Sequence, residues 1–247
     1  MQTTMIGIGN FFFRTRNRVF PCIIVALFAL AVPPVQLMGS VYLENVKDML
    51  AVALSFSGLA FRALVIGFVY IKRGGLNKKV YAENLVTEGI FGLCRNPLYV
   101  GNLLIYAGVF LMHGDPLVMV LGMGSYVFIY QCIVFAEEAY LLNKFGDGYH
   151  AYCREVPRWI PRFSKFREAT EGMVFNFRRV VLKDYTTIAS TTITLALTEG
   201  YEQLAHPELF NRSENIFMMG CVIVAASAMA GIMRLFKKRK WLVENPV

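Results

Sequence analysis

The sequence predicts an all-α, polytopic membrane protein with about six transmembrane helices. Of its 247 residues, 56% are hydrophobic, the mean hydropathy is +0.48, and the apolar residues gather in runs of about 20 residues, long enough to cross a bilayer. The net charge of +8 is concentrated at the ends of these runs, a distribution typical of membrane topology. We therefore expect the lipid bilayer to surround the protein and no nucleic acid as a partner.

Six apolar runs are predicted to form helices. The first is interrupted by Pro33 and Pro34, which should kink or end a helix, and it lacks the cleavage pattern of a signal peptide. The third and fourth form a tight hairpin, because Gly114 and Pro116 mark a turn between them. The predicted spans are residues 19–38, 49–71, 97–112, 117–136, 186–204 and 215–233.

The basic residues predict an orientation. All but three of the 25 lysines and arginines lie in segments 1–18, 72–96, 137–183 and 234–247. Cytoplasmic loops carry an excess of such residues, so both termini and the two polar segments between spans should face the cytoplasm. Arg62 is an exception inside the second span, too deep to reach the surface. It should face the bundle interior and find an acceptor there.

Two polar clusters bracket the predicted hairpin. Before it runs the sequence LVTEGIFGLCRNPLYVG, starting at Leu85, in which Pro97 disfavours helix at Asn96 and favours a helix start. The positive end of that helix suits an anionic or carboxylate-bearing ligand. After the hairpin come Glu137 and Glu138. Charge beside hydrocarbon is expensive, so this pair is expected to have a function.

The ordered motifs of residues 85–161 resemble the membrane family of isoprenylcysteine carboxyl methyltransferases and phospholipid methyltransferases. The motifs are LVTEG, RNPLYVG, the hairpin, the acidic pair, two tyrosines and VPR. The resemblance implies methyl transfer from S-adenosyl-L-methionine, with S-adenosyl-L-homocysteine as product and a cofactor site on the cytoplasmic side. The cofactor-binding residues that it implies are Leu85, Val86, Phe91, Asn96, Pro97, Leu98, Tyr99 and Glu137.

The chain departs from the family pattern at two positions. Asn96 stands where many members have histidine, and an amide does not titrate near neutral pH. Ile133 stands where prenylcysteine-specific members have arginine, so Arg158 or Arg62 would have to bind a substrate carboxylate. An amine or hydroxyl acceptor must lose a proton, for which Glu138 is the nearest base. We therefore expect Glu138 and Arg158 to be catalytic, and a lipid-like or prenylated substrate that enters sideways from the bilayer.

The cysteines and histidines give no pattern of a metal site. Cysteines at positions 22, 94, 132, 153 and 221 show no paired spacing, and the three histidines are scattered. We expect free thiols and no bound metal.

The organisation that these observations predict has three segments. Residues 1–84 form an N-terminal transmembrane pair with a basic connection, residues 85–163 the methyltransferase core, and residues 164–247 an extension with two helices. The extension lies beyond the resemblance, so it is expected to enlarge a lipid pocket, to form a homodimer or to tether a partner.

Two other functions stay open on the sequence. Sterol-type reductases that use NADPH carry a similar loop, but they typically place an acidic residue where this chain has Asn102. A non-catalytic scaffold or transporter is the second alternative, although the chain shows no inverted repeat. The Asn-Pro form of the loop favours a bacterial source, and hence the bacterial inner membrane.

Overall fold

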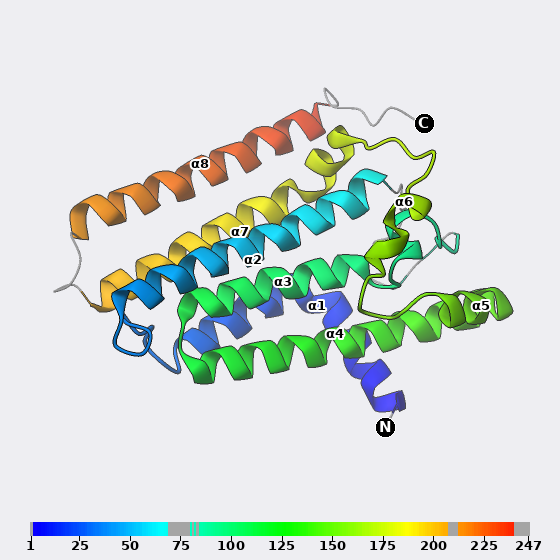
Figure 1. Ribbon diagram of the computed structural model, residues 1–247, viewed down its shortest axis with the longest axis horizontal. Coiled ribbons are helices and arrows are strands. Elements are labelled where there is room, and N and C mark those ends of the chain that lie inside the picture. Colours follow the sequence, from blue (N-terminus) through cyan, green and yellow to red (C-terminus); the bar gives the residue numbers. More distant parts are fainter. Residues whose placement is uncertain (1, 69–79, 81, 83, 207–211, 240–247) are drawn as a thin grey trace.

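The computed structural model describes residues 2–68, 80, 82, 84–206 and 212–239. These residues form helices joined by turns and contain no β-strand (Figure 1). Residues 72–79, 81 and 83 of the basic connection predicted at 72–96 lie outside the described residues, as does the end of the predicted span 49–71. The all-α prediction is confirmed for the described part of the chain.

Six long helices run side by side, and two short ones lie at one end of the bundle (Figure 1). The helices are α1 (Gln2–Phe28), α2 (Val41–Phe68), α3 (Pro97–His113), α4 (Pro116–Phe145), α5 (Asp147–Glu155), α6 (Phe166–Ala169), α7 (Phe177–Ala205) and α8 (Arg212–Lys238), with the 3-10 turns η2 (Gly89–Gly92) and η3 (Phe163–Lys165).

Three of the helices are long and apolar enough to cross a membrane: α2, α4 and residues Glu214–Lys238 of α8. The apolar helix α3 has 17 residues, which is short for a full span. Helices α1 and α7 have lengths similar to those of α2, α4 and α8, but neither contains a stretch as apolar as theirs. The chain is therefore an integral membrane protein with three candidate spans among its described residues.

The prediction for the first helix was wrong at both ends. Helix α1 begins at Gln2, continues through Pro21, and ends at Phe28, before the two prolines that were expected to end it. Its N-terminal half lies along α4, where a Cβ atom on Gly9 would stand 2.0 Å from the carbonyl oxygen of Cys132. This close backbone contact supports the helix far upstream of the apolar run.

Small residues let α2 and α3 approach each other closely. A Cβ atom on Gly108 of α3 would stand 2.0 Å from Ser55 Oγ, and one on Gly58 of α2 would stand 2.5 Å from the carbonyl oxygen of Gly101. Such small-residue contacts are a common way for transmembrane helices to associate. Their consequence is that side chains further along both helices meet inside the bundle.

The predicted hairpin is present, with a tighter turn than expected. Gly114 ends α3 in the left-handed conformation, with φ of 78°. Asp115 then caps α4, since its side chain accepts a hydrogen bond of 3.0 Å from the backbone N–H of Val118. Glycine and an N-cap residue in sequence thus reverse the chain within two residues.

The second arm of the hairpin continues well past its predicted end at residue 136. Helix α4 reaches Phe145, and Leu141 in its last part is buried against Tyr149 and Tyr152 of α5. This contact stabilises the extra turns. Glu137 and Glu138 consequently lie inside a helix and point in different directions, not together at a helix end.

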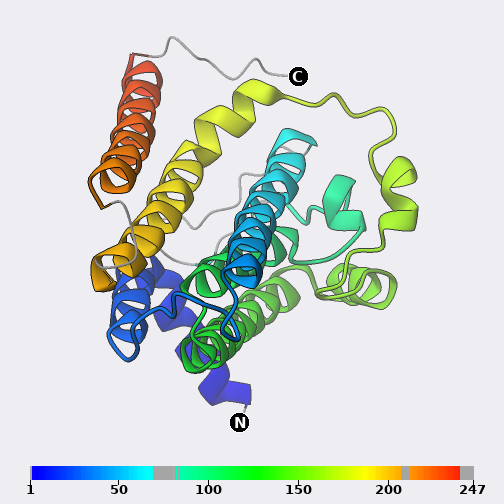
Figure 2. The same ribbon diagram turned by 60° about the vertical axis from the view of Figure 1, so that its left-hand side comes forward.

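The C-terminal extension divides into two helices with different surroundings. Helix α7 packs against α2 and α3 and so belongs to the central bundle. Helix α8 lies alongside α7 on the outside (Figure 2), with an outward surface that exposes large apolar side chains such as Phe217 and Val224. Because α1 packs against α4 and α7 against α3, the bundle that surrounds the hairpin includes both α1 and α7.

Candidate functional site

A cavity of about 810 Å³ lies where the N-terminal half of α3 meets α1, α2, α4 and α7. Six of the eight cofactor-binding residues implied by the family resemblance line it, and they come from η2, the entrance of α3 and α4. They are Phe91, Asn96, Pro97, Leu98, Tyr99 and Glu137. The structure thus brings residues from both ends of the hairpin together.

The remaining two residues of that set, Leu85 and Val86, do not line the cavity. Val86 packs in a cluster with Phe91, and Leu85 packs in another cluster with Tyr149. Both residues therefore pack around the loop of residues 91–96 from outside the cavity.

Glu137 is the carboxylate that faces the cavity. Its Oε1 atom accepts a hydrogen bond of 2.8 Å from the hydroxyl of Tyr99, and Arg16 of α1 interacts electrostatically with both side chains. The Tyr99 ring lies beside Tyr130 with ring centroids 5.1 Å apart. A carboxylate next to aromatic faces is an environment that attracts an organic cation.

Glu138 and Arg158, the two residues expected to be catalytic, lie outside this cavity. The guanidinium of Arg158 donates to both carboxylate oxygens of Glu138, at 2.9 and 2.8 Å. Arg95 approaches the same carboxylate at 3.2 Å. Because successive residues of a helix point about 100° apart, Glu138 faces this arginine pair while Glu137 faces the cavity.

The loop that forms the cavity floor is tied to the segment after α5. Backbone and side-chain groups of residues 91–96 bond to residues 152–162, so the segment that contains the VPR motif holds this loop in place. The bonds run from Tyr152 Oη to Phe91 O (2.7 Å), Arg95 N to Pro157 O (2.9 Å), Asn96 Nδ2 to Arg158 O (3.1 Å) and Arg162 N to Leu93 O (3.1 Å).

Cys94 sits in the interior of this loop. Its side chain is fully buried, and burial raises the pKa of the thiol to about 12, outweighing the opposite effect of a hydrogen bond with the backbone of Asn96. All five cysteines of the chain are free. A neutral thiol at this position packs as a small apolar group and is chemically inert.

Arg62 finds the interior acceptor that the sequence predicted. Its Nε donates to Asp184 Oδ2 at 2.9 Å, a second guanidinium nitrogen bonds the other carboxylate oxygen, and a third donates to Asn102 Oδ1 at 2.6 Å. Asn102 in turn donates to the hydroxyl of Tyr130 at 2.9 Å. This network joins α2, α3, α4 and α7 at the edge of the cavity, and Asp184 balances the charge of Arg62.

Sequence reasoning missed the contribution of α1 and α7. Arg16 and Asn17 of α1, and Arg179, Lys183 and Thr187 of α7, line the same cavity. The available signal was weak: basic residues come before both apolar runs. That pattern is equally expected of membrane anchoring.

Residues 47–148 match the sequence model of the phospholipid methyltransferase family. The expected resemblance is confirmed for this part of the chain, which runs from α2 through the hairpin to the start of α5. The match begins upstream of the predicted core of residues 85–163. Fold and family match together define a helical membrane protein in which residues 47–148 resemble the phospholipid methyltransferase family.

Particular relatives match about a third of the chain. The chain is similar to the protein-S-isoprenylcysteine O-methyltransferase of Schizosaccharomyces pombe, with 37% identity over 78 residues, which cover 31% of this chain and 33% of that protein. It is also similar to the cobalt-zinc-cadmium resistance protein CzcN of Cupriavidus metallidurans, with 33% identity over 85 residues, covering 34% and 39%. The nickel-cobalt-cadmium resistance protein NccN of Alcaligenes xylosoxydans xylosoxydans is 29% identical over 93 residues, covering 38% and 43%.

These matches span only about a third to two-fifths of each relative. No solved structure matches the chain significantly. The helices outside residues 47–148, among them α1, α7 and α8, therefore have no counterpart in the family match.

Proposed function

We propose that the chain is a membrane methyltransferase that transfers a methyl group from S-adenosyl-L-methionine to a lipid-like acceptor. The observation that carries this proposal is the bond between Tyr99 and Glu137 at the wall of the 810 Å³ cavity. Both residues lie in the part of the chain that matches the phospholipid methyltransferase family. The name of the yeast relative supports the same reaction class.

The residues around the cavity fit such a donor. S-adenosyl-L-methionine supplies a methyl group activated by a positively charged sulfur. Glu137 and the rings of Phe91 and Tyr99 would stabilise that charge. The carboxylate at the other end of the cofactor suits the start of α3, where Pro97 opens the helix with its positive dipole end inward.

The chain's contribution to the reaction is positioning and exclusion of water. Glu137 is the carboxylate among the described cavity-lining residues, and its bond to Tyr99 holds it in one orientation. Asn96 cannot accept a proton, and Glu138 is engaged with two arginines outside the cavity. This arrangement favours an acceptor that needs no general base, such as a carboxylate or another anionic oxygen.

The proposed topology has six membrane-crossing helices with both termini in the cytoplasm. The start of α3, the short helices α5 and α6 and the start of α7 lie at the same end of the bundle (Figure 1). The basic segment 137–183 is at this end, and the positive-inside rule places such segments in the cytoplasm. The cofactor would then enter from the cytoplasm, in a bacterial inner membrane.

The test is calorimetric titration of the purified full-length protein with S-adenosyl-L-homocysteine, beside NADPH. We expect saturable binding of the homocysteine compound, and Glu137→Ala should weaken it by about 10- to 100-fold, since a hydrogen bond to a charged group contributes about 1.5–3 kcal/mol. Glu168→Ala, at an exposed position on α6, should bind like wild type. Binding of NADPH instead would indicate a reductase, and folded protein that binds neither compound would overturn the proposal.

A further inference from the structure

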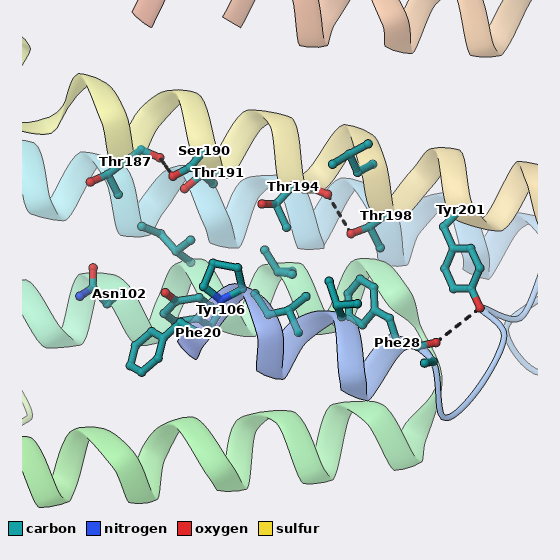
Figure 3. A pocket seen from close by; sticks show the side chains of 17 residues that line it. Phe20, Phe28, Asn102, Tyr106, Thr187, Ser190, Thr191, Thr194, Thr198 and Tyr201 are labelled. Carbon is teal, nitrogen blue, oxygen red and sulfur yellow. Dashed lines mark hydrogen bonds between the residues drawn. The ribbon is translucent and has the colours of Figure 1, made fainter. Parts of the chain in front are cut away.

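A second cavity, of about 580 Å³, continues from the first toward the opposite end of the bundle. It lies between α1 and α7 with α3 behind it (Figure 3). The two cavities share part of their lining and therefore adjoin each other along one path. The shared residues are Phe20, Pro21, Asn102, Tyr106, Thr187 and Ser190.

One face of α7 forms a wall of this second cavity. Thr187, Thr191, Thr194 and Thr198 recur at helical spacing and point toward α1 (Figure 3). The hydroxyl of Thr198 donates to the carbonyl of Thr194 at 2.9 Å, and that of Ser190 to the carbonyl of Thr187 at 3.1 Å. These two hydroxyls are satisfied by the helix itself. At these two positions the wall can therefore cover an apolar ligand without leaving a hydroxyl unpaired.

The opposite wall is apolar, and Tyr201 bridges α7 and α1 at the far end. Ile24 and Val25 of α1 line the cavity, and the hydroxyl of Tyr201 donates to the carbonyl of Phe28 at 3.4 Å (Figure 3). From Thr187 to Tyr201 the helix rises by about 21 Å at 1.5 Å per residue. This length is less than the hydrocarbon core of about 30 Å, so a path of this length can lie within the proposed membrane-crossing bundle.

The near end of the path is rich in positive charge. Arg16, Arg179 and Lys183 line the first cavity, where Glu137 is the opposing carboxylate. Arg179 is only 7% exposed. An acidic head group would be attracted to such an environment, because charge-assisted bonds to buried arginine are strong.

We propose that the second cavity binds the tail of the methyl acceptor, and that this acceptor is a single-chain amphiphile with an acidic head group whose maximum tail length is set by Tyr201. This inference rests on the proposed function and names its substrate class. A volume of 580 Å³ holds roughly 20 methylene-sized groups if each takes about the 30 Å³ of a water molecule. This volume suits one long tail better than the two long tails of a diacyl lipid. Both walls lie outside residues 47–148, so the helices that would select the tail lie outside the family match.

The experiment uses the full-length protein in lipid nanodiscs and a 16-carbon alkyl phosphate with a diazirine at the tail end. After illumination, mass spectrometry locates the labelled residues, and unlabelled competitors are ranked by the concentration that halves labelling. We expect label near Phe28 and Tyr201. Competition by alkyl phosphates should improve about three- to fourfold with each added methylene and stop improving when the tail fills the cavity.

The head group of each competitor and the number of its tails distinguish the classes of lipid that could bind. Fatty acids and alkyl phosphates of equal length should both compete, which would show that an acidic head is sufficient. An alkyltrimethylammonium of the same length and a diacyl phosphatidic acid should compete at least tenfold less well. Equal competition by the cationic or the two-tailed compound would overturn the proposal.

Three variants test the residues. Thr194→Trp should fill the path and reduce labelling at its end more than tenfold, whereas Val224→Trp, at a position of α8 that is 67% exposed, should leave labelling unchanged. Tyr201→Ala should shift the best competitor to a longer tail without loss of labelling. Tyr201→Ala keeps the proposal testable if the tryptophan variant does not fold.

Binding of S-adenosyl-L-homocysteine is measured on the same samples. Thr194→Trp should retain it, because Thr194 does not line the first cavity. Cofactor binding without tail-length dependence would overturn the tail site and leave the methyltransferase proposal standing. Length-dependent labelling without cofactor binding would overturn the proposed function and leave the tail site.

Discussion

The carboxylate of Asp184 on α7 binds the guanidinium of Arg62 on α2 through two of its nitrogens, inside the bundle. Asp184 is only 2% exposed. The ion pair connects a helix of the family core with a helix that lies outside residues 47–148. Because Arg62 and Asn102 also bond each other, the pair fixes the position of α7 beside both cavities.

Removal of the Asp184 carboxylate should therefore destabilise the whole bundle. Asp184→Ala leaves a buried arginine unpaired, and loss of one partner of a buried pair costs about 3–5 kcal/mol. Replacement of both partners, as in Arg62→Met with Asp184→Leu, should restore most of this loss, since a buried pair can be exchanged for apolar packing. Thermal unfolding in detergent measures both effects. A single variant as stable as wild type would show that the pair does not hold α7.

The close contact of α2 and α3 leads to a second prediction, with two glycines as a matched pair. Gly108→Ala brings a methyl group against Ser55 Oγ and the carbonyl oxygen of Ala51, at 2.0 and 2.4 Å before any shift. We expect a loss of about 1–3 kcal/mol in the free energy of unfolding, the usual cost of overpacking. Gly124→Ala on α4 meets nothing within 4 Å and should be neutral or gain up to about 1 kcal/mol from helix propensity. Equal effects of the two substitutions would contradict the tight α2–α3 contact.

Local rules were sufficient to predict the hairpin and the inward orientation of Arg62 toward an acceptor. Pro97 starts α3 and the residues around Gly114 form the turn, because proline and glycine act on their own backbone. Arg62 needed an acceptor on energetic grounds alone. The identity of that acceptor was beyond local rules, since Asp184 is separated from Arg62 by 122 residues and its helix lies outside the family motifs.

The parts of the site that sequence did not predict depend on tertiary contacts. The start of α1 far upstream of the apolar run depends on the approach of Gly9 to Cys132. The separate surroundings of Glu137 and Glu138 follow from the continuation of α4 past residue 136, which the contact of Leu141 with α5 supports. A pattern of apolar residues contains neither contact, so the acidic pair looked like a single cluster at a helix end.

Glu138 should stabilise the loop of residues 91–96, in contrast to Glu137. Glu138→Gln weakens two ion pairs, and we expect a loss of about 1–2 kcal/mol because Arg95 is mostly buried. Arg158→Gln should cost less, about 0.5–1 kcal/mol, since Arg158 is 36% exposed and Glu138 keeps its contact with Arg95. Both losses are measured by unfolding. Abolished methyl transfer in Glu138→Gln with unchanged stability and cofactor affinity would instead support the catalytic role that the sequence predicted.

The buried thiol of Cys94 provides a pH-dependent test of the loop's structure. Only the thiolate reacts with iodoacetamide, and burial raises the pKa of Cys94 from 9.0 to about 12. Below pH 12 the folded protein therefore keeps this thiol protonated. Because the side chain is also fully buried, iodoacetamide reaches it only after the loop opens, so its alkylation in the folded protein, followed by mass spectrometry, should be slow.

The same residue in the protein unfolded by denaturant is the control. There the rate should level off near pH 9, the ordinary value for a cysteine thiol, and at pH 8 it should exceed the folded rate by at least a hundredfold. A folded-state rate within tenfold of the unfolded one at pH 8 would mean that the loop opens readily. In that case the bonds from residues 152–162 to residues 91–96 would be weaker than the structure indicates.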